Sequence, residues 1–83
     1  MTTVVVERWF GKSVPLDEIE AIYDRGAACL EMYGVHLLRS FISNDRSRMI
    51  CLYEAQDADS VRQAQRKAGL PFEAVWVATI IEP

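Results

Sequence analysis

The sequence contains few of the residues that build disulfide frameworks and metal clusters. Its 83 residues include two cysteines, Cys29 and Cys51, and one histidine, His36. The cysteines are far apart in the sequence and form no CxxC motif, so we expect reduced thiols in a cytoplasmic protein. Metal-ligand spacing such as HxxxH, glycine-rich phosphate loops and nucleophile elbows are all absent. Common catalytic and metal motifs therefore do not reveal what the protein does.

Basic charge and long apolar runs are also scarce. The net charge is −3 and the isoelectric point is near 5.0, whereas a protein that binds nucleic-acid phosphates carries a basic face. No apolar run approaches the roughly 20 residues that a membrane-spanning helix needs. The first residues do not form the pattern of a signal peptide. We therefore predict no nucleic-acid partner and no membrane partner.

The chain does have enough apolar residues for a core. It is 51% hydrophobic and 25% charged, which excludes disorder. We predict a single domain over residues 1–83, because a core this small cannot be divided between two units. A chain of this size buries only about 60% of its unfolded surface, so a partner subunit often adds stability.

Residues 34–54 lie at the centre of the predicted fold. Two apolar runs, residues 34–43 and 48–54, flank residues 44–47, whose sequence NDRS is typical of a turn. Neither run alternates strictly between apolar and polar residues. We therefore predict a hairpin of two strands that are covered on both faces.

Two further strands and two helices are predicted on either side of the hairpin. Residues 3–10 and 74–81 are rich in β-branched and aromatic side chains, and we predict that the second run is a wholly buried strand. Residues 16–33 and 58–68 have apolar side chains at helical spacing.

Individual residues mark where the helices begin and end and where they pack. Asp57 caps the second predicted helix, and Gly69 ends it. Gly34 follows the first helix, which carries Gly26 in its apolar stripe. We expect a strand to approach that helix closely at Gly26.

The predicted order of elements is β-α-β-β-α-β, a ferredoxin-like α+β arrangement in which the third strand lies between the first and the second. All four strands are then antiparallel to their neighbours, and both helices lie on one face. The other face would be a large apolar surface, which monomers rarely expose. We therefore predict a homodimer whose two sheets face each other, as in dimeric α/β barrels.

The length of the hairpin turn decides which side chains share a face. An even-numbered turn places Ser43 opposite Arg48. One face then carries Leu37, Arg39, Phe41, Ile50, Leu52 and Glu54, and the other carries His36, Leu38, Ser40, Ile42, Met49, Cys51 and Tyr53. An odd-numbered turn would exchange the two sets.

Charged residues interrupt the predicted strands. Arg39 and Glu54 are diagonal neighbours in the even register, and we favour an ion pair there over the charged lining of a pocket. Glu7 and Arg8 point to opposite faces, so one of them is covered and needs a partner. Glu7 is therefore a candidate general base or ligand anchor, although pairing with Arg39 or Arg48 is the simpler interpretation.

Three other polar side chains in these strands are candidate ligands. His36 and Tyr53 can each be explained as a hydrogen-bonded structural residue or as a base, acid or ligand. Cys51 is better explained as a small core residue than as a reactive thiolate. His36 and Cys51 are about four rows apart, or ~13 Å, so they cannot share one ion within a subunit. A metal site with His36 and Glu54 would need ligands from Glu7 or from the partner.

Four short motifs, spread over nearly the whole chain, resemble a known family. They are Val6-Glu7-Arg8-x-Phe10, Gly34-Val35 followed by Leu38-x-Ser40, Cys51-x-Tyr53-Glu54-Ala55, and Ala68-Gly69-Leu70-Pro71. With these motifs the chain resembles a family of small bacterial proteins catalogued as domain of unknown function 4242. The resemblance implies a fold similar to the dimeric ferredoxin-like α/β barrels, and some relatives are described as nickel-binding. Those relatives are rich in histidine, whereas this chain has only His36.

Three functional hypotheses follow from the sequence. The first is a small cytoplasmic homodimer that binds a metal ion, such as nickel or another divalent metal, or a small polar molecule in a cleft between its sheet and the partner. The candidate ligand-binding residues are Glu7, His36, Arg39, Cys51, Tyr53 and Glu54, with His36 and Glu54 as candidate metal ligands. The second is a cofactor-independent dimeric-barrel enzyme with Glu7 or His36 as base and Tyr53 or Arg39 stabilising an anion. The third is a structural domain with no ligand.

Overall fold

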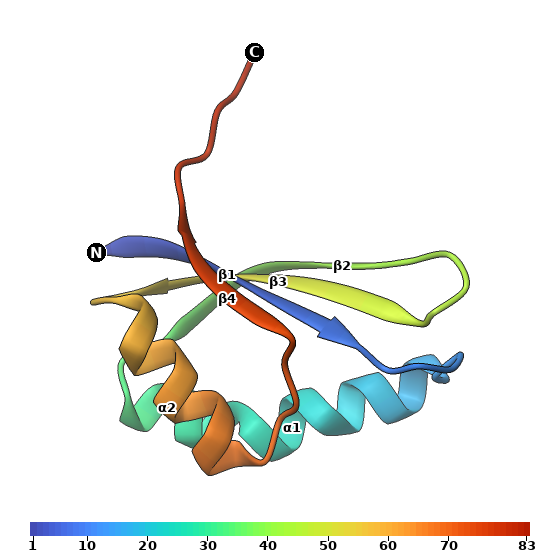
Figure 1. Ribbon diagram of the computed structural model, residues 1–83. Coiled ribbons are helices and arrows are strands. Elements are labelled where there is room, and N and C mark those ends of the chain that lie inside the picture. The colour runs from blue at the N-terminus through green and yellow to red at the C-terminus, as the bar shows by residue number, and fades with distance from the viewer.

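The computed structural model describes residues 1–83 and contains four strands and two helices (Figure 1). In chain order they are β1 (Thr2–Trp9), α1 (Leu16–Met32), β2 (His36–Ile42), β3 (Arg48–Ala55), α2 (Ala58–Ala68) and β4 (Ala74–Ala78). Every predicted element is present, and only the last strand ends far from its predicted boundary. Both helices fall short of the length and apolar character that crossing a bilayer requires.

The four strands form one antiparallel sheet in the order β2-β3-β1-β4. Both helices lie on the same side of this sheet (Figure 1). The predicted ferredoxin-like order, with the third strand between the first and the second, is therefore confirmed. We call the side that carries Val4 and Tyr53 the covered face, because the helices pack on it. The side that carries Val5, Glu7 and Leu52 is the open face.

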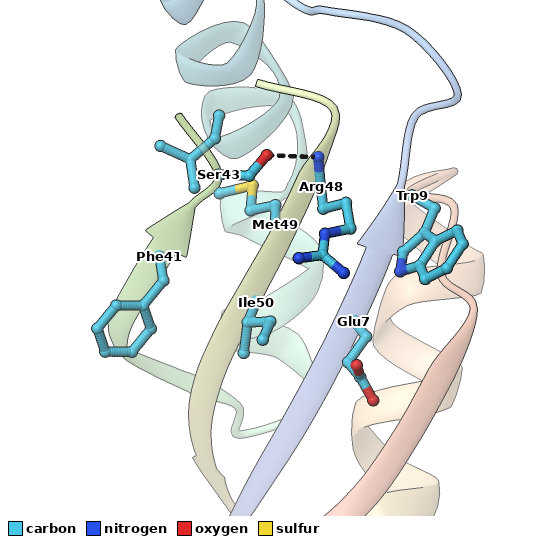
Figure 2. Close-up of a pocket in the computed structure, with 8 residues that line it drawn as sticks. Glu7, Trp9, Phe41, Ser43, Arg48, Met49 and Ile50 are labelled. Atoms are coloured by element: carbon cyan, nitrogen blue, oxygen red, sulfur yellow. Dashed lines mark hydrogen bonds between the residues drawn. The ribbon is translucent and has the colours of Figure 1, made fainter. Parts of the chain in front are cut away.

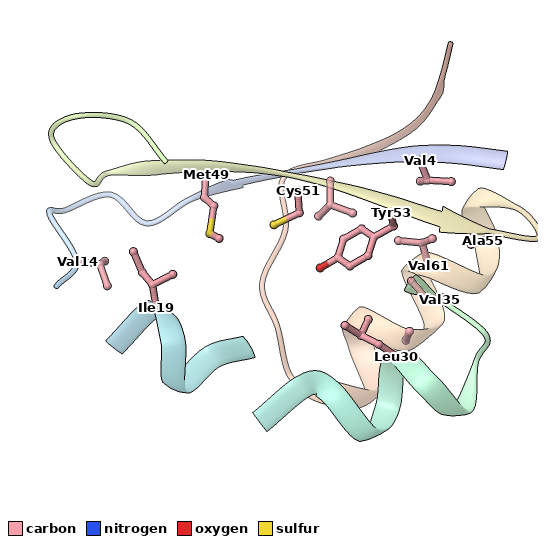
Figure 3. Packing of buried hydrophobic residues seen from close by; sticks show 12 residues of the cluster. Val4, Val14, Ile19, Leu30, Val35, Met49, Cys51, Tyr53, Ala55 and Val61 are labelled. Atoms are coloured by element: carbon pink, nitrogen blue, oxygen red, sulfur yellow. The ribbon is translucent and has the colours of Figure 1, made fainter. Parts of the chain in front are cut away.

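The core lies between the covered face and the two helices (Figure 3). Its members from the sheet include the fully buried Val4, Val6, Cys51, Tyr53 and Ala55, and its members from the helices are the buried Ile19, Leu30, Val61 and Ala64. Side chains in a strand alternate between the two faces, so one set of alternate residues in β1 and β3 supplies the whole sheet side of this core. The other set faces away from the helices.

Capping residues set the helix ends where the sequence predicts them. The Asp57 carboxylate accepts a hydrogen bond of 2.7 Å from the Ser60 amide at the start of α2. Gly69 ends α2 with a φ of 71°, and Gly34 follows α1 with a φ of 67°. Both glycines lie in the left-handed region that other residues rarely adopt, so they end the helices in the predicted way.

Gly26 has a different neighbour from the one predicted. It lies in the buried stripe of α1, and a Cβ added there would be 2.8 Å from Leu70 Cδ1. Leu70 directly follows the residue that ends α2, so the missing side chain lets α1 approach the end of α2. The expected close approach of a strand is therefore wrong.

The last strand is shorter than the apolar run predicts. β4 ends at Ala78, and residues 79–83 run away from the sheet on the side opposite the helices (Figures 1 and 3). Trp76 and Val77 are about half exposed, and Ile81 is 89% exposed. The prediction of a wholly buried strand over residues 74–81 is wrong, because β4 is an edge strand bonded only to β1.

The even-numbered turn is confirmed for most of the hairpin. Ser43 and Arg48 face each other across the turn, and the Ser43 amide donates a hydrogen bond of 3.0 Å to the Arg48 carbonyl. The same register continues along β2 as far as Arg39, which pairs with Leu52.

A β-bulge then changes the register near the start of β2. The pairing shifts between Leu37 and Arg39, so that one extra residue stands in β2. Beyond the bulge His36 pairs directly with Glu54. The predicted placement of His36 on the face of Cys51 and Tyr53 is therefore wrong, since one extra residue reverses the alternation of side chains.

The turn of the hairpin is built around the Asp45 carboxylate. One oxygen of this group accepts hydrogen bonds of 2.7 Å from the Ser43 hydroxyl, 2.7 Å from the Ser47 hydroxyl and 3.0 Å from the Ser47 amide. These bonds, first those from the two hydroxyls, lower the pKa of Asp45 from 3.8 to about 2. The charged carboxylate therefore stabilises the turn.

We predict that acid loosens this turn over a defined range of pH. The folded-state pKa of Asp45 lies below its ordinary value, so its contribution is fully present above about pH 4 and is lost as pH falls toward about 2. NMR titration of the Ser47 amide should therefore show a midpoint near pH 2, and Asp45→Asn should abolish that transition. A midpoint at the ordinary pKa of an aspartate would contradict the turn geometry.

Candidate functional site

The open face of the sheet exposes a broad apolar surface. Phe41, Ile50 and Trp76 are each between 39% and 52% exposed, and Trp9 at the end of β1 is 61% exposed. No helix lies on this side, so the predicted cover on both faces of the hairpin is not supplied within one chain. Contiguous exposed apolar side chains are uncommon on isolated subunits, so the open face is a candidate interaction surface.

A cavity of about 230 Å³ lies on the open face near the hairpin turn (Figure 2). Its apolar walls include Trp9, Phe41 and Ile50, and its polar groups include Glu7 and Arg48. The guanidinium of Arg48 lies over the Trp9 ring, 5.8 Å from the ring centre. A cation over an indole face is stabilised by the ring electrons, so Arg48 is held at this wall without a carboxylate partner.

Glu7 lies on the open face and accepts a hydrogen bond of 2.8 Å from the Trp76 indole nitrogen. The expected pairing of Glu7 with Arg39 or Arg48 is not formed, and the carboxylate bonds to the Trp76 indole instead. A single neutral donor leaves the second carboxylate oxygen of Glu7 free for a ligand. Glu7 therefore remains a candidate ligand anchor.

His36 and Glu54 are direct cross-strand neighbours at the other end of the open face. His36 pairs with Glu54 across β2 and β3, and Glu54 pairs with Thr3 across β3 and β1. Side chains paired in this way have Cβ atoms about 5 Å apart, so both can reach one ligand. Glu7 is four residues along β1 from Thr3, or ~13 Å, and cannot join them within one chain.

Arg39 and Glu54 do not form the ion pair that we favoured. Arg39 is exposed and pairs across the strands with Leu52, while the bulge places His36 directly opposite Glu54. An exposed ion pair contributes only about 0–1 kcal/mol to stability, so the fold loses little when Arg39 and Glu54 do not pair. The open face therefore presents Arg39 as an unpaired cation.

Two of the predicted ligand residues lie on the covered face instead. Cys51 and Tyr53 are both fully buried. The Cys51 sulfur lies 3.4 Å from the Ser40 hydroxyl and 3.6 Å from the Tyr23 hydroxyl, and the two hydroxyls are hydrogen-bonded to each other. Burial raises the pKa of the Tyr23 phenol. The six predicted ligand residues are thus divided between two faces of the sheet.

The sequence interpretation missed a buried polar network centred on Arg8. Arg8 is 2% exposed and donates hydrogen bonds to the Pro71 carbonyl at 2.8 Å, to the Tyr53 hydroxyl at 3.1 Å and to Gln65 Oε1 at 2.5 Å. All three acceptors are neutral. Of the two adjacent charged residues in β1, Arg8 is therefore the one that is covered.

Gln65 is the second member that the sequence did not reveal. It is fully buried in α2, and its Nε2 has no hydrogen-bond partner. The sequence did contain one signal for its burial. Gln65 follows Val61 by four residues, so both lie on the inward face of α2, whose apolar stripe is thin. Burial raises the pKa of Tyr53, as does nearby Cys51, while Arg8 acts in the opposite direction.

A second, more open cavity of about 490 Å³ lies between α1 and the start of β2. Its polar groups are Tyr23, Asp24, Glu31 and His36. His36 thus borders both this cavity and the open face, because it lies at the start of the edge strand β2, beside α1.

One chain does not contain a complete metal site. No group of three or more histidine, cysteine, aspartate or glutamate side chains is close enough to hold an ion. His36 and Glu54 supply two donors, an imidazole nitrogen and a carboxylate oxygen, which suit nickel and related divalent ions. The remaining ligands would have to come from outside the chain.

Comparison with known proteins places these features in context. A family model described as "Nickel responsive protein SCO4226-like" matches residues 5–77. Among solved structures, the chain is similar to the crystal structure of SCO4226 from Streptomyces coelicolor A3(2), with a TM-score of 0.86 and 14% sequence identity. That match covers 96% of this chain and 99% of the other chain, and it shows a shared fold. No curated protein matches the sequence significantly.

We predict that the buried network behaves as one unit in stability measurements. Arg8→Met and Gln65→Met should each lower the free energy of unfolding by about 2–3 kcal/mol, because each leaves a buried polar group with fewer partners. The double variant should lose clearly less than the sum, with a coupling of about 1 kcal/mol or more. Urea unfolding measures the free energy of unfolding of the two single variants and of the double variant.

The matched control for this cycle is Arg25→Met, which removes an exposed cation from α1. It should change the free energy of unfolding by less than about 0.5 kcal/mol. Strict additivity of the Arg8 and Gln65 losses would show that the two side chains do not depend on each other.

Proposed function

The chain belongs to the SCO4226-like family of nickel-responsive proteins. From this premise we propose that the protein is a small homodimer that binds a divalent metal ion. Ni²⁺ is the first candidate. The ion, or a small polar ligand in its place, lies in a cleft between the open faces of two copies. His36 and Glu54 are the proposed metal ligands of each copy. Glu7 and Arg39 line the same cleft.

The observation that carries this proposal is the direct pairing of His36 with Glu54 on the open face. These are the chain's only imidazole and a half-buried carboxylate, and the bulge brings them opposite each other. Two donors are too few for a stable site, which usually takes four or more. A second copy on the open face supplies further donors, and in a pair with opposed strands its Glu7 carboxylate lies nearer to His36 and Glu54 along the strands than its own His36 does.

The exposed apolar side chains support the homodimer part of the proposal. Trp9, Phe41, Ile50 and Trp76 lie on the side of the sheet that has no helix. Covering them with a second copy would remove apolar surface from water at about 25 cal/mol per Å² and would enclose the charged groups between them. Enclosure matters for binding, because a ligand interacts more strongly with charged groups that water does not screen.

Arg39 and Glu7 fit the alternative ligand, a small polar molecule with an anionic group. Arg39 is an unpaired cation, and Glu7 has one oxygen without a protein donor. We leave Cys51 and Tyr53 out of the proposed contact set, because the covered face buries both completely. Their role is to pack the core beneath the cleft.

We expect native mass spectrometry of the purified protein to show a dimer that gains the mass of bound nickel when Ni²⁺ is added. Glu54→Gln and His36→Asn should each weaken Ni²⁺ binding by about tenfold or more, or ~1.4 kcal/mol, because each removes one ligand. Titration calorimetry measures the affinities. Glu20→Gln, which changes an exposed carboxylate on α1, is the matched control.

Three results separate the parts of this proposal. A protein that stays monomeric at micromolar concentration would contradict the shared cleft. A dimer that binds no nickel, or binds it equally well after Glu54→Gln and His36→Asn, would contradict the metal site. Unchanged nickel binding in the Glu20→Gln control is required for either variant to count.

A further inference from the structure

Residues 79–83 form an apolar segment without cover from their own chain. Ile80 is 54% exposed and Ile81 is 89% exposed. The segment leaves the sheet on the side opposite the helices, as both views of the chain show (Figures 1 and 3). Two adjacent isoleucines directed toward the side of the apolar open face are placed to cover a surface of the same kind.

The cavity near the hairpin turn has the chemistry to receive this segment. Trp9, Phe41 and Ile50 supply apolar walls, Arg48 supplies a cation that lies over the Trp9 ring, and Glu7 adds a carboxylate to the lining (Figure 2). The segment continues from its two isoleucines into Glu82, which is exposed and has the opposite charge. Apolar side chains followed by a carboxylate thus match an apolar cavity with a cation at its wall.

A chain cannot fill its own cavity with this segment. The segment begins after Ala78, which pairs with Thr3, whereas the cavity lies near Trp9 at the far end of β1. Six residues of strand separate the two ends, or ~20 Å, and five extended residues span at most about 17 Å. In a two-fold dimer whose facing strands run in opposite directions, the end of β4 at Ala78 in one copy lies over the end of β1 at Trp9 in the other copy.

We propose that residues 79–83 are an exchange arm, which lies on the open face of a second copy. Ile81 fills the cavity beside Trp9, Phe41 and Ile50 of that copy, and Glu82 forms an ion pair with its Arg48. Both copies exchange arms in the same way. This inference depends on the proposed homodimer. It adds the contact that sets the direction of one sheet relative to the other.

The test is a charge exchange followed by sedimentation equilibrium. Glu82→Arg and Arg48→Glu should each raise the dimer dissociation constant by about tenfold, because each places two like charges together. The double variant restores opposite charges with the positions reversed, so its dissociation constant should return to within about threefold of the original. Ile81→Ser should weaken the dimer in the double variant as well as in the original.

Glu20→Arg controls for a change of net charge and should leave the dissociation constant unchanged. Circular dichroism of each variant verifies folding, and all substituted side chains are exposed. A dimer whose dissociation constant does not respond to Ile81→Ser or to either charge change would overturn the arm and leave the homodimer in place. A protein that is monomeric before any substitution would overturn the homodimer and the arm together.

Discussion

Two helices can shield only one side of a four-stranded sheet, and this limit determines most of what the molecule presents to its surroundings. The covered face receives both α1 and α2, and its alternate residues in β1 and β3 form the core. The remaining alternate residues place aromatic and aliphatic groups in contact with water, together with Glu7, Arg39 and Glu54. Apolar surface favours association and charged groups favour selectivity, so one face combines the two properties that a shared binding cleft requires.

The interior of this small domain is not held together by apolar contacts alone. Arg8 joins β1 to the Tyr53 hydroxyl of β3, to Gln65 of α2 and to the Pro71 carbonyl before β4. These acceptors come from three separate parts of the chain, so the network fixes α2 and its exit loop relative to the sheet. A buried cation with neutral acceptors is costly to form, and such groups give directional contacts that interchangeable apolar side chains lack.

The fold was predictable because turns, caps and periodicity all act locally. Gly34, Asp57 and Gly69 mark helix ends by properties of the residue itself, and the order of elements then leaves few topologies. The site was less predictable, since side-chain placement depends on register. The adjacent leucines 37 and 38 break the alternation, but the position of an extra residue follows from packing across strands. Burial of Arg8 rather than Glu7 likewise depends on acceptors from distant segments, and the exposure of residues 79–83 depends on the absence of a neighbouring strand.

The bulge in β2 divides the strand into two parts, and the alternation of side chains between the two faces differs from one part to the other. From Arg39 toward the turn the odd-numbered residues face the open side, whereas before the bulge His36 faces the open side and Leu37 faces the helices. Loss of the extra residue would restore a regular ladder and keep His36 opposite Glu54, whereas closure of the bulge without that loss would move the imidazole one place along β3 and into the interior of the protein. Functional groups transplanted onto this strand must therefore be counted separately on each side of the bulge, and an alignment with a strand that lacks the bulge needs a one-residue gap here to join positions that face the same direction.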